Sequence, residues 1–157
     1  MSIEKVREYL EDQGFADRIK EFSVSSATVA LAAEALGIDG SRIAKSLSFM
    51  TEEGAILVVA AGDAKVDNRK YKERFGIKAK MLSYEDCESL IGHAVGGVCP
   101  FAVNEGVKVY LDESLKRFDT VYPACGSSSS AIELSIEELE RLSKFVDWVD
   151  VTKLCTL

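Results

Sequence analysis

The sequence is short of the residues that metal and disulfide chemistry use. It has one histidine and four cysteines in 157 residues, and no two cysteines have the CxxC spacing. This does not fit the usual Cys/His zinc pattern, so no metal and no cofactor are expected. Free, reduced thiols are expected at all four cysteines, which are Cys87, Cys99, Cys125 and Cys155.

Long apolar runs are also missing. No run approaches the ~20 residues that a membrane-spanning helix needs, so no membrane partner is expected. The first residues are charged and amphipathic and lack the apolar core of a signal peptide, which predicts a cytoplasmic location. With 47% hydrophobic and 29% charged residues, the composition is that of a globular protein, and the length predicts one domain over residues 1–157.

An overall positive charge is absent as well. The net charge of −7 excludes a protein that coats nucleic acid with its whole surface. Residues 65–80 nevertheless carry seven lysines or arginines against two acidic residues, a net +5 that leaves −12 for the rest of the chain. A local basic face suits a partner that docks in one place, although a solvated helix face would have the same pattern.

The periodicity of apolar residues predicts alternating strands and helices. Thr28 and Gly37 are typical cap residues around a helix, and the apolar run 55–61 predicts a central strand buried on both faces. The irregular alternation predicts an α+β domain with a mixed sheet flanked by helices. Strands are expected at 19–24, 45–50, 55–61, 78–82, 107–111, 120–124, 131–134 and 145–149. Helices or helical turns are expected at 2–14, 29–36, 40–44, 67–75, 83–91, 112–118 and from Ser135 onward.

A glycine-rich loop from Gly92 to Phe101 combines three glycines, the only histidine and one of two prolines. Gly96 and Gly97 let the backbone take positive φ or let a ligand approach it closely. The N–H groups of Gly96, Gly97 and Val98 could therefore hold a carbonyl oxygen or an oxyanion. The alternative is a tight helix-to-strand turn without a ligand.

Lys45 begins a strand with alternating polarity. It lies on the same side of that strand as Leu47 and Phe49, and an ammonium at the head of an apolar face must stay wet or be paired. The alternative is an edge lysine whose stem lies on the apolar surface while its charge reaches water.

Several stretches, taken together in their order and spacing, resemble one family. They are 28–37, the segment Ile43-Ala-Lys-Ser-Leu-Ser-Phe49, Ala61-Gly-Asp63 followed by Lys70, the 92–101 loop, Val109-Tyr-Leu-Asp112, and Gly126 before Ala-Ile-Glu-Leu134. The sequence is similar over nearly its whole length to the YbaK/EbsC family, freestanding relatives of the editing domain inserted in bacterial prolyl-tRNA synthetase.

The resemblance implies a curled mixed sheet with surrounding helices. It also implies hydrolysis of mischarged aminoacyl-tRNA, with a wrong amino acid on proline tRNA as the substrate. The partner would be the 3′ acceptor end of the tRNA, and prolyl-tRNA synthetase is a candidate second partner. Lys45 matches the essential lysine of the family. The glycine–proline loop matches at Gly96, Gly97 and Pro100, and Gly126 matches a second loop.

From these matches we expect the loop amides to hold the ester carbonyl, and Lys45 to bind the terminal phosphate or orient the 3′ end. No side chain is a compelling general base, and the resemblance implies that the terminal ribose hydroxyl helps to activate water. Ala131 departs from relatives that have a polar or acidic residue there, so no side-chain role is expected at that position. Substrate contacts are expected at Val98, Cys99, His93, Phe49, Gly126 and Ser127. Contacts to tRNA are expected at Lys65, Arg69 and Lys70.

Two other functions remain open at this point. A thiol hydrolase could use Cys99 or Cys125 with His93 as its base, which requires the base within hydrogen-bond reach. A non-catalytic tRNA- or synthetase-binding module could keep the fold without the chemistry. The sequence leaves open which amino acid is removed, which tRNA carries it, and the oligomeric state.

Overall fold

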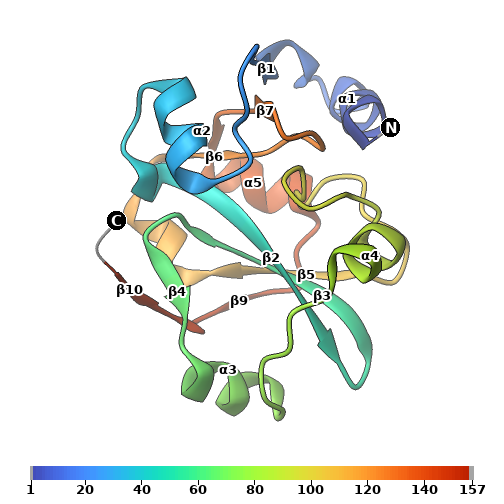
Figure 1. Ribbon diagram of the computed structural model, residues 1–157, viewed down its shortest axis with the longest axis vertical. Coiled ribbons are helices and arrows are strands. Elements are labelled where there is room, and N and C mark those ends of the chain that lie inside the picture. The colour runs from blue at the N-terminus through green and yellow to red at the C-terminus, as the bar shows by residue number, and fades with distance from the viewer. Residues whose placement is uncertain (1, 156–157) are drawn as a thin grey trace.

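A six-stranded mixed sheet forms the centre of the computed structural model, which describes residues 2–155 (Figure 1). The strand order is β8-β6-β2-β3-β5-β9. β2 and β3 form an antiparallel hairpin, while β6 runs parallel to β2, and β5 and β9 continue parallel beyond β3. This confirms the predicted α+β class with a mixed sheet. The strands are β2 (Ile43–Thr51), β3 (Gly54–Ala61), β5 (Lys108–Asp112), β6 (Thr120–Pro123), β8 (Leu134–Ser135) and β9 (Asp147–Val149).

Two short ribbons lie beside this sheet. β1 (Lys20–Glu21) pairs with β7 (Ser130–Ala131), and β4 (Ala64–Val66) pairs with β10 (Thr152–Leu154). The predicted strand 19–24 was too long, because beyond Glu21 the chain follows the serine-rich turn through isolated bonds such as Phe22 N to Ser129 O. The predicted strand 131–134 is likewise divided between β7 and β8. The β4–β10 ribbon was not predicted.

The helices cover both faces of the sheet. Helix 29–36 is confirmed with its caps, because Thr28 Oγ1 accepts a hydrogen bond from Leu31 N and Gly37 has a φ of 69°. The helix predicted over 83–91 begins as an α-helix and continues as a π-helical turn. The α-helices are α1 (Ser2–Asp12), α2 (Val29–Leu36), α3 (Asn68–Phe75), α4 (Tyr84–Asp86) and α5 (Ile136–Ser143). The shorter turns are η1 (Ala16–Arg18), η2 (Gly40–Arg42), η3 (Cys87–Ile91, the π-helical turn) and η4 (Glu113–Arg117).

Two segments next to β2 differ from the prediction. β2 begins at Ile43 and not at Lys45, because Ile43 and Ala44 pair with β6 after the short turn η2. The predicted strand 78–82 is a loop that runs along β2 and forms only one bridge, between Met81 and Phe49. Its contacts with β2 are hydrogen bonds from Met50 N to Lys80 O (2.9 Å) and from Leu82 N to Ser48 O (3.2 Å).

The strand β3 separates two apolar cores. Leu57 and Val59 belong to the larger core, whereas Ile56 and Val58 belong to a second core on the side of α3. All four side chains are at most 3% exposed, which confirms the predicted central strand. In the second core Tyr71 of α3 lies 4.9 Å, centroid to centroid, from Phe49. α3 lies at the lower end of the molecule in Figure 1, and α2 lies at the upper left.

A buried carboxylate holds the segment around β10 against the sheet. Asp112, at the end of β5, is fully buried. Its side chain accepts hydrogen bonds from Val151 N (2.9 Å), Thr152 Oγ1 (2.7 Å) and Ser114 N (3.0 Å). These donors replace the water that the carboxylate loses on burial, so β10 is held in place by a charged group.

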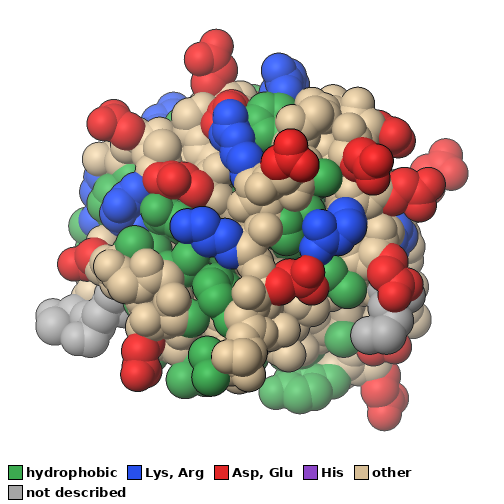
Figure 2. All heavy atoms as spheres, turned by 90° about the horizontal axis from the view of Figure 1, so that it is seen from above, with side chains coloured by type: hydrophobic (Ala, Val, Ile, Leu, Met, Phe, Trp, Pro, Cys, Tyr) green, Lys and Arg blue, Asp and Glu red, His purple; other side chains and the backbone are tan. Residues whose placement is uncertain are grey.

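The surface mixes both signs of charge. On the face seen from above in Figure 2, lysine and arginine side chains are scattered among acidic ones, and hydrophobic groups fill the spaces between them. That face therefore has no single basic patch. Within residues 2–155, no helix has the length and apolar character needed to cross a membrane.

Helix α5 offers a test of the local signals. Ser135 Oγ accepts from Glu138 N (3.1 Å), and Glu138 Oε1 accepts from Ser135 N (2.9 Å). We expect Ser135→Ala to lower the free energy of unfolding by about 1 kcal/mol, because it removes one half of this capping box. Ser135→Thr keeps the hydroxyl and should cost much less. Urea denaturation measures both variants, and equal losses would contradict the assignment.

Candidate active site

A cavity of about 320 Å³ lies between α2, the first half of β2, the segment 81–87 and the glycine-rich loop. Three of the predicted site residues line it, namely Lys45, Gly96 and Val98. Its walls are built mostly from small side chains, which include Ala32, Ala44, Ser46, Ser48, Ala124, Ser130 and Ala131. The cavity thus joins segments that are far apart in the sequence around one lysine.

Lys45 is partly buried at this cavity. Its Nζ donates a hydrogen bond to the carbonyl oxygen of Gly62 at 3.4 Å. Burial lowers the pKa of Lys45 below its ordinary value, and the nearby charges of Asp63 and Cys155 oppose that shift. An ammonium with a single protein acceptor keeps donors available for a ligand.

The glycine-rich loop differs in detail from the prediction. The Gly97 amide donates to Ala94 O at 3.0 Å, so it closes a turn and is not available to a ligand. Gly96 has the positive φ, at 99°, whereas Gly97 does not. Among the described residues, no hydrogen bond engages the amide of Gly96 or of Val98. Of the three amides predicted to bind a ligand, those of Gly96 and Val98 are therefore still available as donors.

Gly97 is required by close packing between two loops. A Cβ atom at this position would lie 2.6 Å from the carbonyl carbon of Gly126 and 2.6 Å from the amide nitrogen of Ser127. Gly126 and Ser127 do not line the first cavity. Together with Gly97 they border a more open one, of about 630 Å³, on the other side of the loop. Val95 lines both cavities, so the loop is a partition between them.

His93, Cys99 and Pro100 are buried behind the loop and do not line the first cavity. Cys99 Sγ lies 3.6 Å from His93 Nε2, but the same Nε2 lies 2.7 Å from Phe101 O. A carbonyl only accepts, so Nε2 carries the hydrogen and cannot take a proton from the thiol. Burial raises the pKa of Cys99 to about 12 and lowers that of His93. This geometry speaks against the thiol hydrolase.

The other cysteine and the aromatic residue expected at the site are also remote from the cavity. Cys125 is fully buried, and burial raises its pKa well above the ordinary value. Phe49 is 1% exposed and packs in the second core, on the α3 side of the sheet. Ser46 and Ser48, which alternate with Phe49 along β2, line the cavity, whereas Phe49 does not.

Several cavity residues were missed by sequence reasoning. Ser46 and Ser48 alternate onto the cavity side of β2, which the strand pattern could have shown. The Ser46 hydroxyl has no hydrogen-bond partner among residues 2–155. Met81 and Tyr84 also line the cavity and are 58% and 77% exposed. No local signal marks these two as cavity residues, because Met81 lies in the loop that tertiary contacts hold against β2, and Tyr84 begins α4 directly after that loop.

The basic segment 65–80 is partly neutralised by ion pairs. Arg69 pairs with Glu73 (3.3 Å), Lys70 with Asp150 (3.0 Å) and Arg74 with Asp147 (3.3 Å). Within the described part of the chain, no acidic side chain lies within 4 Å of the other four cations, which are Lys65, Lys72, Lys78 and Lys80. Lys80 directly precedes the cavity residues Met81 and Leu82. Of the unpaired cations, Lys78 and Lys80 are nearer to the cavity along the chain than the paired cations of α3, whereas Lys65 and Lys72 are not.

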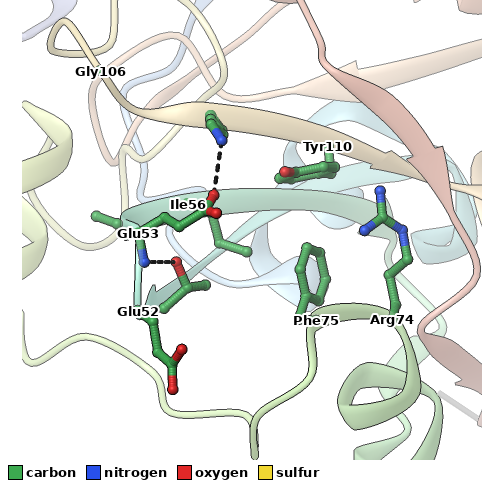
Figure 3. A pocket seen from close by; sticks show the side chains of 10 residues that line it. Glu52, Glu53, Ile56, Arg74, Phe75, Gly106 and Tyr110 are labelled. Atoms are coloured by element: carbon green, nitrogen blue, oxygen red, sulfur yellow. Dashed lines mark hydrogen bonds and ion pairs between the residues drawn. The ribbon is translucent and has the colours of Figure 1, made fainter.

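A third cavity, of about 220 Å³, lies between the β2–β3 hairpin, α3 and β5 (Figure 3). The Arg74 guanidinium lies 5.2 Å and 5.5 Å from the ring centroids of Phe75 and Tyr110. Lys108 pairs with Glu53 at 3.0 Å across its upper edge. None of the predicted site residues lines this cavity, and two of its charged residues, Lys108 and Glu53, are paired with each other, so the first cavity is the candidate site.

Comparison with known proteins gives concordant results. The family model of the aminoacyl-tRNA editing domain matches residues 24–142. The chain is 52% identical over 154 residues to the uncharacterized protein YwhH of Bacillus subtilis (strain 168), covering 98% of both chains. It is 27% identical over 117 residues to the proline–tRNA ligase of Bacillus cytotoxicus, covering 74% of this chain and 20% of the ligase. The chain therefore matches about a fifth of that ligase.

Solved structures show the same relationship. A crystal structure described as that of "a putative trans-editing enzyme for prolyl tRNA synthetase" superposes with a TM-score of 0.87 and 31% identity, over 97% of both chains. A crystal structure of the hypothetical protein APE2540 gives a TM-score of 0.83 and 29% identity, over 95% of this chain and 99% of the other.

The contact between the two loops gives a second prediction. Gly97→Ala should lower the free energy of unfolding by about 2 kcal/mol or more, because the methyl group meets backbone atoms that cannot turn aside. Gly96→Ala is the matched control. Its Cβ has ordinary contacts, at 3.4 Å and 3.5 Å, and only the positive φ opposes it, at a cost of about 1 kcal/mol. Thermal and urea unfolding measure both, and a larger loss at Gly96 would contradict the packing argument.

Proposed function

The chain belongs to the aminoacyl-tRNA editing domain family, and from that premise we propose that it hydrolyses the ester bond of mischarged aminoacyl-tRNA. The single observation that carries the proposal is that Lys45, Gly96 and Val98 line one cavity, while the amides of Gly96 and Val98 donate no hydrogen bond within residues 2–155. An aminoacyl ester is already activated, so positioning and charge stabilisation can supply most of the catalysis.

The glycine-rich loop is the proposed site for the ester carbonyl. As water attacks, the carbonyl oxygen gains negative charge, and the amides of Gly96 and Val98 can donate to it without reorganisation. The acyl carbon–oxygen bond then breaks, and the ribose oxygen leaves with a proton. Gly97, Pro100 and Gly126 hold the loop in this shape through packing and do not touch the substrate.

The attacking water needs a base, and the described residues that line the cavity include no histidine or carboxylate for this role. His93 is fully buried behind the loop. We therefore assign activation of the water to the ribose hydroxyl next to the ester, as the family resemblance implies. Lys45 binds the terminal phosphate or orients the 3′ end, because it is the cation that lines the cavity.

The walls of the cavity favour a small aminoacyl group. Four alanines line the cavity beside the serines of β2, namely Ala32, Ala44, Ala124 and Ala131. They leave space for a small aminoacyl side chain but little space for a long one. At the mouth, the exposed ring of Tyr84 can stack on a base of the single-stranded acceptor end. The proline–tRNA ligase and trans-editing relatives favour proline tRNA as the carrier, with prolyl-tRNA synthetase as a partner.

A non-catalytic tRNA-binding module is the second candidate function. The exposed residues at the mouth of the cavity and the unpaired lysines could bind tRNA in such a module as well as in an enzyme. It predicts binding of charged tRNA without turnover, so a deacylation assay separates the two candidates.

We expect Lys45→Ala to reduce deacylation about 100-fold or more, the scale of one lost electrostatic contact at a reaction centre. The assay is release of amino acid from proline tRNA charged with Ala, Cys, Ser, Thr or Pro, together with other tRNAs carrying the same amino acids. His93→Ala and Cys99→Ser should keep most of the activity if they fold. A folded Lys45→Ala variant with unchanged turnover would remove Lys45 from the site.

The basic segment generates a separate prediction for binding. Changing Lys65, Lys78 and Lys80 together to Gln should weaken tRNA binding and flatten its salt dependence by about 2 units of log K per log [salt], because three phosphate contacts release fewer counterions. Arg69 and Lys70 were also predicted to bind tRNA, and their changes should have less effect because acidic partners already neutralise them. Lys108→Gln is the control at a distant ion pair, and an unchanged slope in the triple variant would move the docking surface elsewhere.

A further inference from the structure

The turn between β3 and β4 is built tightly against Lys45. It contains Gly62, whose carbonyl oxygen accepts the hydrogen bond from Lys45 Nζ at 3.4 Å. A Cβ atom on Gly62 would lie 1.9 Å from Gly40 O and 2.9 Å from Val29 Cγ1. The turn therefore packs directly on η2 and on the first residue of α2, which also lines the cavity.

The next residue, Asp63, is held in a two-pronged ion pair. Arg117 at the end of η4 donates from Nη1 to Asp63 Oδ2 at 3.0 Å and from Nη2 to Asp63 Oδ1 at 2.5 Å. Arg117 Nε also donates to Ser114 O at 2.9 Å, which fixes the guanidinium. The Asp63 side chain is only 16% exposed, so water screens this pair less than a surface pair.

Backbone contacts complete the arrangement. Cys155 N donates to Asp63 O at 2.7 Å, and Ala61 N donates to Ser114 Oγ at 3.1 Å. The turn is thus joined to η4 on one side and to the segment after β10 on the other. The ion pair is the charged part of this frame, and it lies one residue from the acceptor of Lys45.

We propose that the Asp63–Arg117 ion pair is the positioning device for Lys45 in the deacylation reaction. The pair fixes the Gly62 carbonyl that accepts from the Lys45 ammonium. It also keeps the Asp63 carboxylate close to Lys45. Neither residue touches the substrate. This inference rests on the proposed function, but its central measurement does not require turnover.

The surroundings of Lys45 make the charge of Asp63 decisive. The charges that act on Lys45 are those of Asp63 in the turn and Cys155 after β10, and the titratable residues that line the same cavity are Cys87, Tyr84 and Tyr122. Burial lowers the pKa of Lys45 and Asp63 is the first opposing charge, which favours the ammonium form. Arg117 weakens the influence of the Asp63 carboxylate on Lys45, because the ion pair holds this carboxylate toward η4.

Two substitutions should therefore move Lys45 in opposite directions. Asp63→Asn keeps the shape of the side chain but leaves Arg117 uncompensated, so the titration midpoint of Lys45 should fall by about 0.5 pH unit or more. Arg117→Met frees the Asp63 carboxylate, so the midpoint should rise. If the ion pair only stabilised the turn, both substitutions would loosen the turn and let water reach Lys45. The titration midpoint of Lys45 would then rise toward the ordinary lysine value in both variants.

The test is NMR titration of protein labelled with ¹³C at lysine Cε, with Lys45→Ala used to assign the signal. Asp147→Asn is the matched control, because it breaks an Asp–Arg pair on β9 that lies three strands away from β2. Opposite shifts in the two variants, with none in the control, support the proposal. Shifts of the same sign, or no shift in Asp63→Asn, overturn it.

Kinetics provides the second measurement. Asp63→Asn should reduce kcat for deacylation at least several-fold while the midpoint of thermal unfolding stays near that of Asp147→Asn. Its rate should also decline at lower pH than that of the unmodified protein, since Lys45 loses its proton earlier. A variant with unchanged kcat and an unchanged pH profile contradicts the positioning role. Absence of turnover in the unmodified protein contradicts the proposed function instead, and the NMR result then stands alone.

Discussion

The close approach of two backbones, at Gly97 and at Gly126–Ser127, is the constraint on which the candidate site depends. Because no side chain separates them, the glycine-rich loop is held as a thin partition with a cavity on each side. The amides of Gly96 and Val98 can then face the first cavity, while His93, Cys99 and Pro100 fill the space behind. Side-chain chemistry in this loop is thus secondary to its backbone geometry.

Much of the fold could be predicted from the sequence. The apolar run of β3, the caps of α2 and the capping box of α5 are local signals, and each is found where it was expected. The errors have tertiary causes. Strand 78–82 lacks a full partner beside β2, and the chain after Glu21 follows the serine-rich turn. The β4–β10 ribbon depends on the buried Asp112, which no sequence pattern reveals.

The candidate site was predictable in part. Lys45, Gly96 and Val98 are motif residues, and the structure brings them to one cavity. Phe49, His93 and Cys99 share the same motifs but point into the cores, because strand alternation and loop packing decide direction, and a motif does not. Met81 lies in a loop, and Tyr84 begins α4 after it, and only the folded chain defines where this segment lies. Their roles, like those of Lys65, Arg69 and Lys70, stay predictions.

The buried Asp112 has a consequence for biosynthesis. Its acceptors are filled by Val151 and Thr152, and Cys155 N closes on Asp63 O beside Lys45. A nascent chain that lacks this segment lacks two of the three hydrogen bonds to the Asp112 carboxylate and has an incomplete frame around the lysine. Contacts between residues so far apart in the sequence carry a loop-closure cost that slows folding. The surroundings of Lys45 would therefore be complete only once residues 151–155 are available to pack against the sheet.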